Sequence, residues 1–402
     1  MKLLVVSHKS CWSSPDSSTG YASDGGFPFQ MRAISELFDA TTLMLPCLSP
    51  ESRAGETPLA GHNLSVIPLP TPAGAGLRRK LNMFFWLFRN LPILFREVRR
   101  ADAVHTPIPS DIGTIGMLLA FFTRKPLFVR HCGNWFVQKT MAERFWKWFM
   151  ERFAGGRDVM VATGGATGPP SERNDAIRWI FSTSLTQEEL SDFATRGVEA
   201  RGEATRLIIA CRQERAKGTG VVIESLPHIL KDFSSASLDV VGDGASLEKF
   251  KLLADSLQVS DRITFHGKVN HETVLELLRQ ASLFCYPTTA SEGFPKAVLE
   301  ALACGLPVVT TRVSVLEQLI GTGCGVLMHE ATPMALAEAV RECLSDQKRY
   351  QVMSKQAIET ARQYSLERWR KSIGDLLSPC WGPLRTDPDG VDVLSLLSRA
   401  DQ

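Results

Sequence analysis

The sequence contains no apolar run of about 18 residues or more, the length that a membrane-spanning helix needs. Its first residues, MKLLVVSHKS, turn polar too soon for the apolar core of a signal peptide. An excess of one charge is also missing, because the formal net charge of the 402 residues is +2. Without a strong overall field, nucleic acid is not an expected partner. We therefore expect a cytoplasmic protein that recognises its ligands through local groups.

Paired cysteines are missing too. The nine cysteines include no C-x-x-C pair, which argues against a zinc site, and their odd number argues against a disulfide framework. Several lie in apolar runs, where a free thiol behaves as a small apolar side chain. We expect reduced, mostly buried thiols at Cys11, Cys47, Cys132, Cys211, Cys285, Cys304, Cys324, Cys343 and Cys380.

Apolar runs alternate with helical patterns in two successive series. The first series opens with Lys2–Val6 and the second with Arg206–Cys211, and the polar stretch Leu185–Thr205 between them has the composition of a linker. Short apolar strands that alternate with helices favour a parallel sheet with helices on both faces. The predicted fold class is therefore α/β, with doubly wound, Rossmann-like domains.

Chain length sets the number of these domains. One hydrophobic core usually stops growing near about 250–300 residues, so we predict two domains and a tail. The first domain would cover residues 1–200, the second 201–378, and a peripheral tail 379–402. Ligands of such sheets bind at the carboxyl ends of the strands, so we expect them in a cleft between the two domains.

The segment SEGFPKAVLEALACGLP carries the most specific pattern. Pro295 suits the first position of a helix and Gly305 its end. Glu292 lies in the loop before this helix, and Glu300 leans back toward it because helical side chains point to the N-terminus. Free N–H groups at a helix start favour an anion such as a diphosphate, and carboxylates accept hydrogen bonds from sugar hydroxyls. The segment therefore indicates a ligand with both phosphate and sugar hydroxyls.

A simpler interpretation makes Lys296 and Glu300 a solvated surface pair with i,i+4 spacing. The flanking residues favour a ligand site instead, because the segment with its flanks resembles the E-x7-E motif of the GT-B-fold glycosyltransferases. The resemblance is to family 4, the glycosyl transferase group 1 proteins. Further matches across the second domain are CRQERAKG (Cys211–Gly218), VVGDG (Val240–Gly244) and ITFHGKV (Ile263–Val269).

The resemblance implies a role for each matching residue. Arg212 and Lys217 would bind the donor diphosphate and stabilise its charge as it leaves, a task that suits a guanidinium and an ammonium. Glu292 would bind hydroxyls of the donor sugar, and Glu300 those of the ribose. The other implied donor-binding positions are Gly242, Gly244, His266, Gly267, Gly293, Phe294, Pro295 and Lys296.

The first domain offers fewer matches. The resemblance places Gly25 and Gly26 close to the donor phosphate and the acceptor, where a backbone without Cβ can approach a ligand. An ordinary loop pair of glycines is the alternative. The resemblance also places a strand-end histidine near the reacting carbon; His131 is our candidate for that catalytic position, and His105 is its competitor. Acceptor-side groups could include Asp24 and Asp111.

The implied reaction is transfer of a sugar from a nucleoside diphosphate to an acceptor hydroxyl with retention of configuration. The donor would be a UDP- or GDP-sugar, and the acceptor a glycan or lipid-linked intermediate of surface polysaccharide or glycoconjugate synthesis. We expect no cofactor and no metal, because the one D-x-D match, Asp387–Asp389, lies in the tail. Two positions where the family commonly has glycine, Cys211 and Pro295, leave the charged groups unaffected.

Two stretches combine aromatic and basic residues, Arg78–Arg100 and Arg144–Arg152. Basic aromatic helices often lie on anionic membrane surfaces, which predicts a peripheral protein on the inner face of the membrane. The alternative is a pair of core helices with solvated arginines. A lipid-linked acceptor would suit the membrane interpretation.

Two other functions are compatible with these patterns. A nucleotide-sugar 2-epimerase shares the GT-B fold but is not expected to combine R-x4-K with E-x7-E. A non-catalytic nucleotide-sugar-binding subunit would not need an intact set of donor-site charges. A dehydrogenase is disfavoured, because GDGASL lacks the third glycine of the dinucleotide fingerprint.

Overall fold

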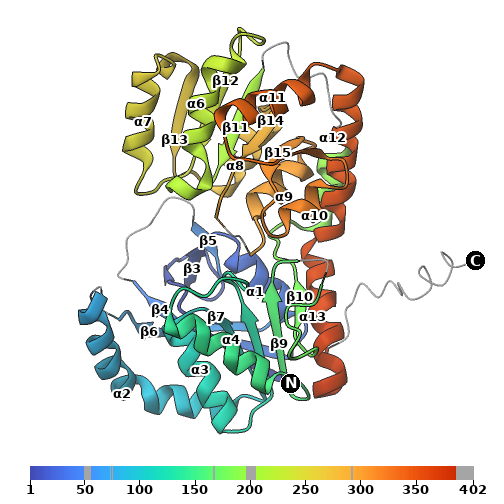
Figure 1. The fold of residues 1–402 in the computed structure, drawn as a ribbon. Coiled ribbons are helices and arrows are strands. Elements are labelled where there is room, and N and C mark those ends of the chain that lie inside the picture. The colour runs from blue at the N-terminus through green and yellow to red at the C-terminus, as the bar shows by residue number, and fades with distance from the viewer. Residues whose placement is uncertain are drawn as a thin grey trace, which may run out of the picture.

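The computed structural model describes residues 1–48, 56–72, 74, 76–165, 168–195, 205–290 and 293–385. Figure 1 shows two α/β halves, one above the other, each built around a sheet that is flanked by helices. The lower half contains the beginning of the chain, and the upper half contains the strands after residue 205. The predicted class of two Rossmann-like α/β domains is confirmed.

The first half is built on a parallel seven-stranded sheet of order β10-β9-β8-β7-β1-β4-β6. Its strands are β1 (Lys2–Val6), β4 (Ala40–Cys47), β6 (Leu64–Pro70), β7 (Ala103–Ile108), β8 (Leu127–His131), β9 (Asp158–Thr163) and β10 (Arg178–Ile180). The central strands β1, β7, β8 and β9 are buried almost throughout, as expected for a parallel sheet covered by helices, whereas the edge strands β6 and β10 are partly exposed. The helices are α1 (Phe27–Ser35), α2 (Gly76–Arg100), α3 (Asp111–Phe122) and α4 (Met141–Phe153), and α5 (Gln187–Thr195) follows them but packs on the second half.

A small antiparallel sheet lies where the first half faces the second (Figure 1). It consists of β2 (Trp12–Ser13), β3 (Tyr21–Asp24) and β5 (Glu56–Pro58). Two of these strands, β2 and β3, lie in the polar stretch between β1 and α1. The sheet fixes the chain just before Gly25 and Gly26, so these glycines have a defined position at the start of α1.

The second half is built on a parallel six-stranded sheet of order β13-β12-β11-β14-β15-β16. Its strands are β11 (Arg206–Ala210), β12 (Ser237–Val241), β13 (Ile263–Gly267), β14 (Leu283–Tyr286), β15 (Val308–Thr311) and β16 (Gly325–Met328). Its helices are α6 (Thr219–Ile229), α7 (Leu247–Ser256), α8 (His271–Gln280), α9 (Lys296–Ala303), α10 (Leu316–Ile320), α11 (Pro333–Leu344) and α12 (Gln347–Ala361). Short 3-10 turns are η1 (Arg215–Lys217), η2 (Ser260–Arg262) and η3 (Arg362–Tyr364).

The last helix, α13 (Leu366–Trp381), returns to the first half (Figure 1). Trp369, Ile373 and Leu377 are fully buried in the core that β1, α1 and β4 form. The predicted boundaries of the second domain, 201–378, therefore include a helix that belongs to the first domain, because the apolar stripe of α13 is buried in the core of the first domain. The predicted tail is also shorter, since α13 extends to Trp381; residues 386–402 lie outside the described part.

The predicted linker also contains structure. Leu185, Leu190 and Phe193 are buried in the core of the second half, the latter two on helix α5. Because most residues of this stretch are polar, the sequence did not indicate that these three apolar side chains are buried. Among the described helices, α2 included, none combines the length and apolar character needed to span a bilayer.

Candidate active site between the two domains

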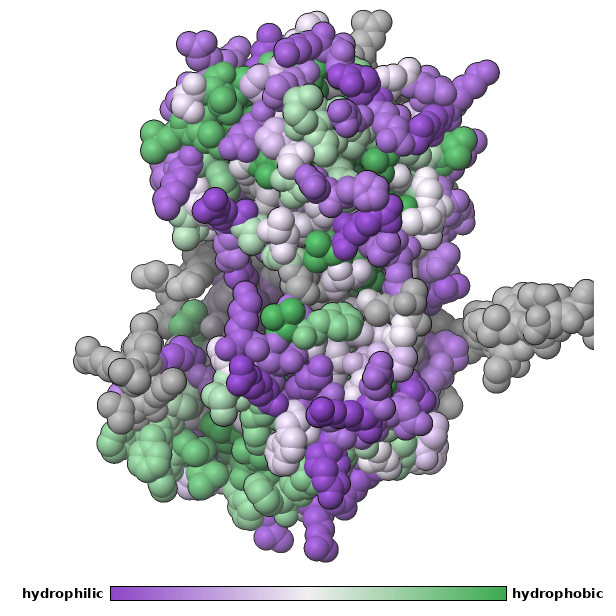
Figure 2. Space-filling model, in the orientation of Figure 1, coloured by the Kyte–Doolittle hydropathy of each residue, from purple (hydrophilic) through white to green (hydrophobic). Residues whose placement is uncertain are grey.

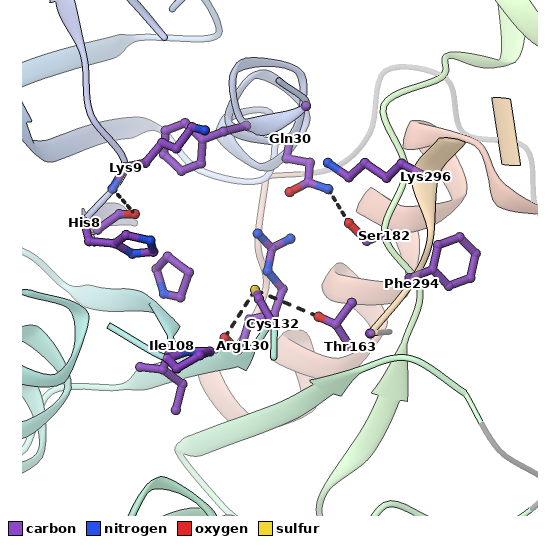
Figure 3. A pocket seen from close by; sticks show the side chains of 16 residues that line it. His8, Lys9, Gln30, Ile108, Arg130, Cys132, Thr163, Ser182, Phe294 and Lys296 are labelled. Atoms are coloured by element: carbon purple, nitrogen blue, oxygen red, sulfur yellow. Dashed lines mark hydrogen bonds between the residues drawn. The ribbon is translucent and has the colours of Figure 1, made fainter. Parts of the chain in front are cut away.

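A cavity of about 370 Å³ lies between the two halves. Its lower wall consists of residues at or just after the carboxyl ends of β1, β7, β8 and β9, together with the start of α1. Its upper wall is the turn at the start of α9, with Gly293, Phe294 and Lys296. This is the end of a parallel sheet at which ligands are expected. Figure 3 shows Lys296 of the upper wall and Gln30 and Arg130 of the lower wall pointing into the space between the walls.

Gly26 and Lys296 meet across this cavity. A Cβ on Gly26 would lie 2.2 Å from the Lys296 Nζ and 3.2 Å from the Cβ of Ser184. The absent side chain therefore makes room for the lysine, which reaches toward Gln30 in Figure 3. The neighbouring Gly25 has a φ of +65°, a left-handed conformation that favours glycine. Gly26 therefore has a packing reason to be glycine, and Gly25 a backbone reason; contact of either residue with a donor or acceptor remains a prediction.

The amine of Lys296 is held inside the cavity wall. Burial lowers the pKa of Lys296 to about 8; the nearby positive charge of Arg130 acts in the same direction, and the negative charge of Glu300 partly opposes both. Within the described residues its Nζ has no carboxylate partner within 4.0 Å, the limit for an ion pair. Lys296 is therefore a cation that the surrounding protein does not neutralise by direct pairing.

Arg130 lies opposite, at the end of β8, and is 4% exposed. Its guanidinium points into the space between the walls (Figure 3) and packs on the ring of Trp369, 5.2 Å from the ring centre. Its Nε and Nη1 are buried without a hydrogen-bond partner in the described structure. Buried polar groups without partners are uncommon and costly, so this side chain is a candidate ligand-binding group.

The two candidate histidines do not line the cavity. His131 follows Arg130 on β8, so its side chain points to the opposite face, where its ring packs on Trp135. Burial lowers the pKa of His131 to about 4, so the ring is neutral near pH 7. His105 stacks on Phe128, and burial lowers its pKa to about 3. His105 is a core residue, and a role of His131 in the reaction remains a prediction.

The two candidate acceptor-side carboxylates have basic partners. Asp24 forms an ion pair with Lys9 and lies 3.6 Å from the Nζ of Lys268 in the second half. Burial would raise the pKa of Asp24, but the hydrogen bond to Lys9 and the positive charges of Lys9 and Lys268 together outweigh that effect, and the net shift is downward. Asp111 pairs with Arg79 at 3.0 Å. Asp24 therefore connects the two halves at the rim of the site.

A second cavity of about 350 Å³ lies in the second half, also against α9. It is lined by residues at the carboxyl ends of β11 and β12, by the segment after β13, and by α9. Arg212 is exposed here, with 74% of its side chain accessible, and pairs with Glu214 at 3.1 Å. The structure thus brings Arg212, Gly242 and Glu300 together in one cavity.

Glu300 is buried at the bottom of this arrangement, with 8% of the residue exposed. Its Oε1 accepts hydrogen bonds from the Ser184 hydroxyl and the His271 ring, both at 3.1 Å. Burial would lower the pKa of His271, but the hydrogen bond to Glu300 and the negative charges of Glu300 and Glu189 together outweigh it, and the net shift is upward. The alternative of a solvated Lys296–Glu300 surface pair is wrong, because Glu300 is enclosed and its hydrogen-bond partners are Ser184 and His271.

The predicted glycine turn supports the loop that carries Arg212. A Cβ on Gly242 would lie 2.0 Å from the carbonyl oxygen of Cys211, and one on Gly244 would lie 2.5 Å from that of Gln213. The Gln213 amide is buried and donates to the carbonyl of Val241 at 2.9 Å. These glycines therefore let the two loops pack together. Direct contact of Gly242 and Gly244 with a donor remains a prediction.

Other predicted donor residues lie around the second cavity. His266 is paired with Asp239 at 2.6 Å, and the cavity wall after β13 consists of Lys268 and Val269. Gly267 has a φ of +64°, which turns the chain toward Lys268. The remaining predicted positions are Lys217 at the end of η1, Phe294 and Gly293 in the first cavity, and Pro295 before α9. Glu292 lies outside the described residues.

No metal site is evident in the described ranges, where no three histidine, cysteine or acidic side chains are placed to hold an ion. All nine cysteines are free thiols. Cys132 and Cys380 are exposed, whereas mostly buried positions were expected. Because Cys132 follows β8 beside Arg130, its thiol lines the first cavity.

Comparison with known proteins agrees with this geometry. Residues 193–360 match the family model "Glycosyl transferases group 1". The D-inositol 3-phosphate glycosyltransferase of Corynebacterium urealyticum is 29% identical over 335 residues, covering 77% of this chain and 74% of that protein. The chain is a glycosyltransferase whose second domain matches the group 1 family. It resembles family 4.

Two further similarities extend the comparison. A putative colanic acid biosynthesis glycosyltransferase of Salmonella typhimurium, WcaL, is 30% identical over 161 residues, covering 38% of this chain and 39% of that protein. The crystal structure of Anabaena Alr3699/HepE in complex with UDP aligns with a TM-score of 0.69 at 16% identity, covering 94% of this chain and all of that chain. That likeness shows the GT-B fold, as predicted.

Sequence reasoning about this glycosyltransferase missed several residues of the first cavity. Arg130, Lys9 and Gln30 come from three separate elements of the first domain and carry no motif. His131 was the predicted site residue on this strand, although its neighbour Arg130 is the one that faces the cavity. A strand's period of two could have raised this alternative, because adjacent side chains point to opposite faces.

Proposed function

We propose that this glycosyltransferase moves a sugar from a nucleoside diphosphate to an acceptor hydroxyl, with the nucleotide in the second cavity and the acceptor in the first. The observation that carries the proposal is the position of α9. Its first residue, Lys296, lines the first cavity, while Ala297 and Glu300 line the second. A donor that spans the start of this helix would place its sugar between the two cavities.

The donor half rests on charges in the second cavity. Arg212 and Lys217 would neutralise the leaving diphosphate, which a metal ion does in other transferases. Glu300, held by Ser184 and His271, would accept hydrogen bonds from ribose hydroxyls. Glu292 would bind the donor sugar. UDP and GDP are both candidate nucleotides, and UDP has the support of the Anabaena complex.

We infer retention of configuration and a reaction without a metal. With no carboxylate assigned as nucleophile, the acceptor hydroxyl would attack the same face from which the diphosphate leaves. Incubation with UDP- and GDP-sugars and measurement of nucleoside diphosphate release would test the donor. Proton NMR of the product would show its anomeric configuration, and an inverted product or loss of activity with EDTA would contradict this mechanism.

Two alternative activities have distinct outcomes in the same assay. A 2-epimerase would convert the free nucleotide sugar when no acceptor is present. A non-catalytic subunit would keep its cellular role after Arg212→Ala and Glu292→Ala. Formation of a glycosylated acceptor by the purified chain would exclude both.

We also propose that the first domain lies on an anionic membrane surface, in agreement with a glycan or lipid-linked acceptor. Figure 2 shows hydrophobic side chains gathered at the lower left, over α2, α3 and α4. Phe85, Phe122 and Met141 are 70%, 76% and 77% exposed. Beside them an apolar groove between α2, α3 and α4 is lined by Phe84, Ile115 and Trp146. Core helices would bury these side chains.

A flotation assay tests this surface. The chain should float with phosphatidylglycerol vesicles at low salt, and Phe85→Ser combined with Phe88→Ser should reduce flotation severalfold. Leu252→Ser, an equally exposed apolar position in the second domain, is the matched control. Absence of flotation at low salt would remove the membrane proposal. Localisation on the inner membrane face depends on the same result.

A further inference from the structure

The first cavity contains two cations that the protein leaves unpaired. Arg130 has buried nitrogens without partners, and Lys296 lacks a carboxylate within ion-pair distance among the described residues. The third cation of the cavity, Lys9, is different because Asp24 neutralises it. The unpaired positive charge is therefore concentrated at Arg130 and Lys296.

Such an arrangement is unfavourable without a ligand. Arg130 and Lys296 repel each other, as the effect of Arg130 on the pKa of Lys296 shows. Burying a charge without a partner costs free energy, and an anion between the two would recover it. A guanidinium binds phosphate with two parallel hydrogen bonds, and an ammonium adds a point charge.

The position of Arg130 separates it from the nucleotide site, whereas Lys296 lies at the start of α9, where the charge of Glu300 also acts on it. Arg130 belongs to β8 of the first domain, and the cavity in which it lies shares no lining residue with the cavity that contains Arg212 and Glu300. The amides at the start of α9 were predicted to bind the donor, but the Lys296 side chain extends to the first domain beside Gly26. An anion bound by these two side chains would therefore lie in the first cavity, on the acceptor side.

We propose that Arg130 and Lys296 form a phosphate subsite for the acceptor, so that the transferase uses an acceptor that carries a phosphate group near the hydroxyl it glycosylates. This inference rests on the proposed function, because it assigns the second cavity to the donor. The phosphate can belong to a soluble ester or to a lipid headgroup, since both present the same oxygens.

The fold holds this subsite in place from two sides. The ring of Trp369 on α13 packs against the Arg130 guanidinium. Next to Lys296, the Gln30 amide donates to the Ser182 hydroxyl at 2.8 Å and to the Thr183 carbonyl at 3.0 Å. The return of α13 to the first domain therefore has a functional consequence, because it positions Arg130.

Calorimetry with inorganic phosphate, in the presence of saturating UDP or GDP, tests the subsite. We expect phosphate to bind the wild-type chain, and Arg130→Gln and Lys296→Gln each to weaken that binding about 10- to 100-fold. Arg130→Lys should restore part of the affinity. Arg173→Gln, which removes an arginine that is 82% exposed in the same domain, should leave it unchanged.

The nucleotide provides the fold control and the decisive contrast. Arg130→Gln should bind UDP or GDP with wild-type affinity, which also shows that it is folded. The proposal is overturned if wild type binds no phosphate, if neither substitution changes phosphate affinity, or if nucleotide and phosphate affinity fall together. If wild type binds no nucleoside diphosphate at all, the proposed function fails, while phosphate titration of the free chain still tests the subsite.

Vesicles identify the carrier of the phosphate. If Arg130→Gln floats less than wild type with phosphatidylglycerol vesicles, the subsite binds a lipid headgroup. Equal flotation, together with lost phosphate binding, assigns a soluble phosphate ester. Both results support the subsite, and weaker flotation with unchanged phosphate affinity would contradict it.

Discussion

The two cavities that meet at α9 differ in how their charges are paired. In the second domain Glu300 has Ser184 and His271 as partners, and Arg212 has Glu214. In the first-domain cavity Arg130 has no hydrogen-bond partner for two buried nitrogens. The paired side is preorganised for a polyol with many hydroxyls, whereas the unpaired side requires an anion from outside. The difference suggests that nucleotide and acceptor are recognised by different physical means.

The largest effect is expected from replacing Trp369, whose ring packs on the Arg130 guanidinium of the first cavity. Trp369→Ala empties a fully buried site on α13 and should lower the free energy of unfolding by about 3–5 kcal/mol. Urea unfolding followed by tryptophan fluorescence measures this loss. Lys371→Ala, at an exposed position of the same helix, is the control and should have little effect. If Trp369→Ala lowered the free energy of unfolding as little as Lys371→Ala does, α13 would contribute little to the core of the first domain.

On the paired side, Arg212→Ala should lower kcat for donor turnover by about 100- to 1,000-fold, because charge on the leaving diphosphate loses a fixed partner. Stopped or coupled assays of nucleoside diphosphate release measure it. Arg215→Ala, in the turn that follows, provides a charge-matched control. A loss of the same size in that variant would indicate a general effect of positive charge and not a specific contact.

Glu300→Gln sharpens the comparison within the second cavity. The amide keeps the shape but loses the charge that His271 pairs with, so nucleotide affinity should fall about tenfold. Titration with UDP and GDP gives the value. Glu272→Gln, on the exposed face of α8, should bind normally. Unchanged affinity of Glu300→Gln would remove this residue from the nucleotide site.

The smallest effect concerns pH. The pKa of Lys296 is lowered by burial to about 8, so its positive charge is complete well below pH 8 and is lost as pH rises through 8. Sulfate, whose charge is constant in this range, should bind the first cavity less tightly at pH 9 than at pH 7, by at most about tenfold per pH unit. The other charged or titratable groups near the amine are Arg130, Glu300, Cys132 and Lys9.

Lys296→Met is the control for that measurement. Its sulfate affinity should be lower at pH 7 and nearly independent of pH up to 9, because the titrating amine is gone. A pH dependence that persists in this variant would assign the effect to another group, and Cys132→Ser would then test the thiol. Wild-type binding that is constant from pH 7 to 9 would contradict the role of Lys296.

The second domain was largely predictable because its chemistry lies in contiguous motifs. The glycine turn of VVGDG and the helix after Pro295 both occupy the positions that local residue types indicated. The structure excluded the alternative in which Lys296 and Glu300 form a solvated surface pair, because Glu300 is buried. Spacing along a helix gives the relative direction of two side chains, but it cannot show which other element covers them.

The first domain was less predictable because its cavity collects single residues from separate strand ends. Arg130 and His131 are adjacent, and only the sheet and its coverings decide which of them faces the other domain. The same holds for α13, whose apolar stripe is visible in the sequence but whose partner is not.

The sequence by itself determined the two parallel-sheet domains, the glycosyltransferase class and the motifs that contain Arg212, Gly242 and Glu300, which line the second cavity. It did so because buried strands, helix ends and glycine turns depend on neighbours along the chain. Only the tertiary structure decided that α13 returns to the first domain, that Gly26 makes room for Lys296, and that Arg130 faces it. Those facts depend on contacts between residues far apart in the chain, which hydrophobic periodicity does not encode.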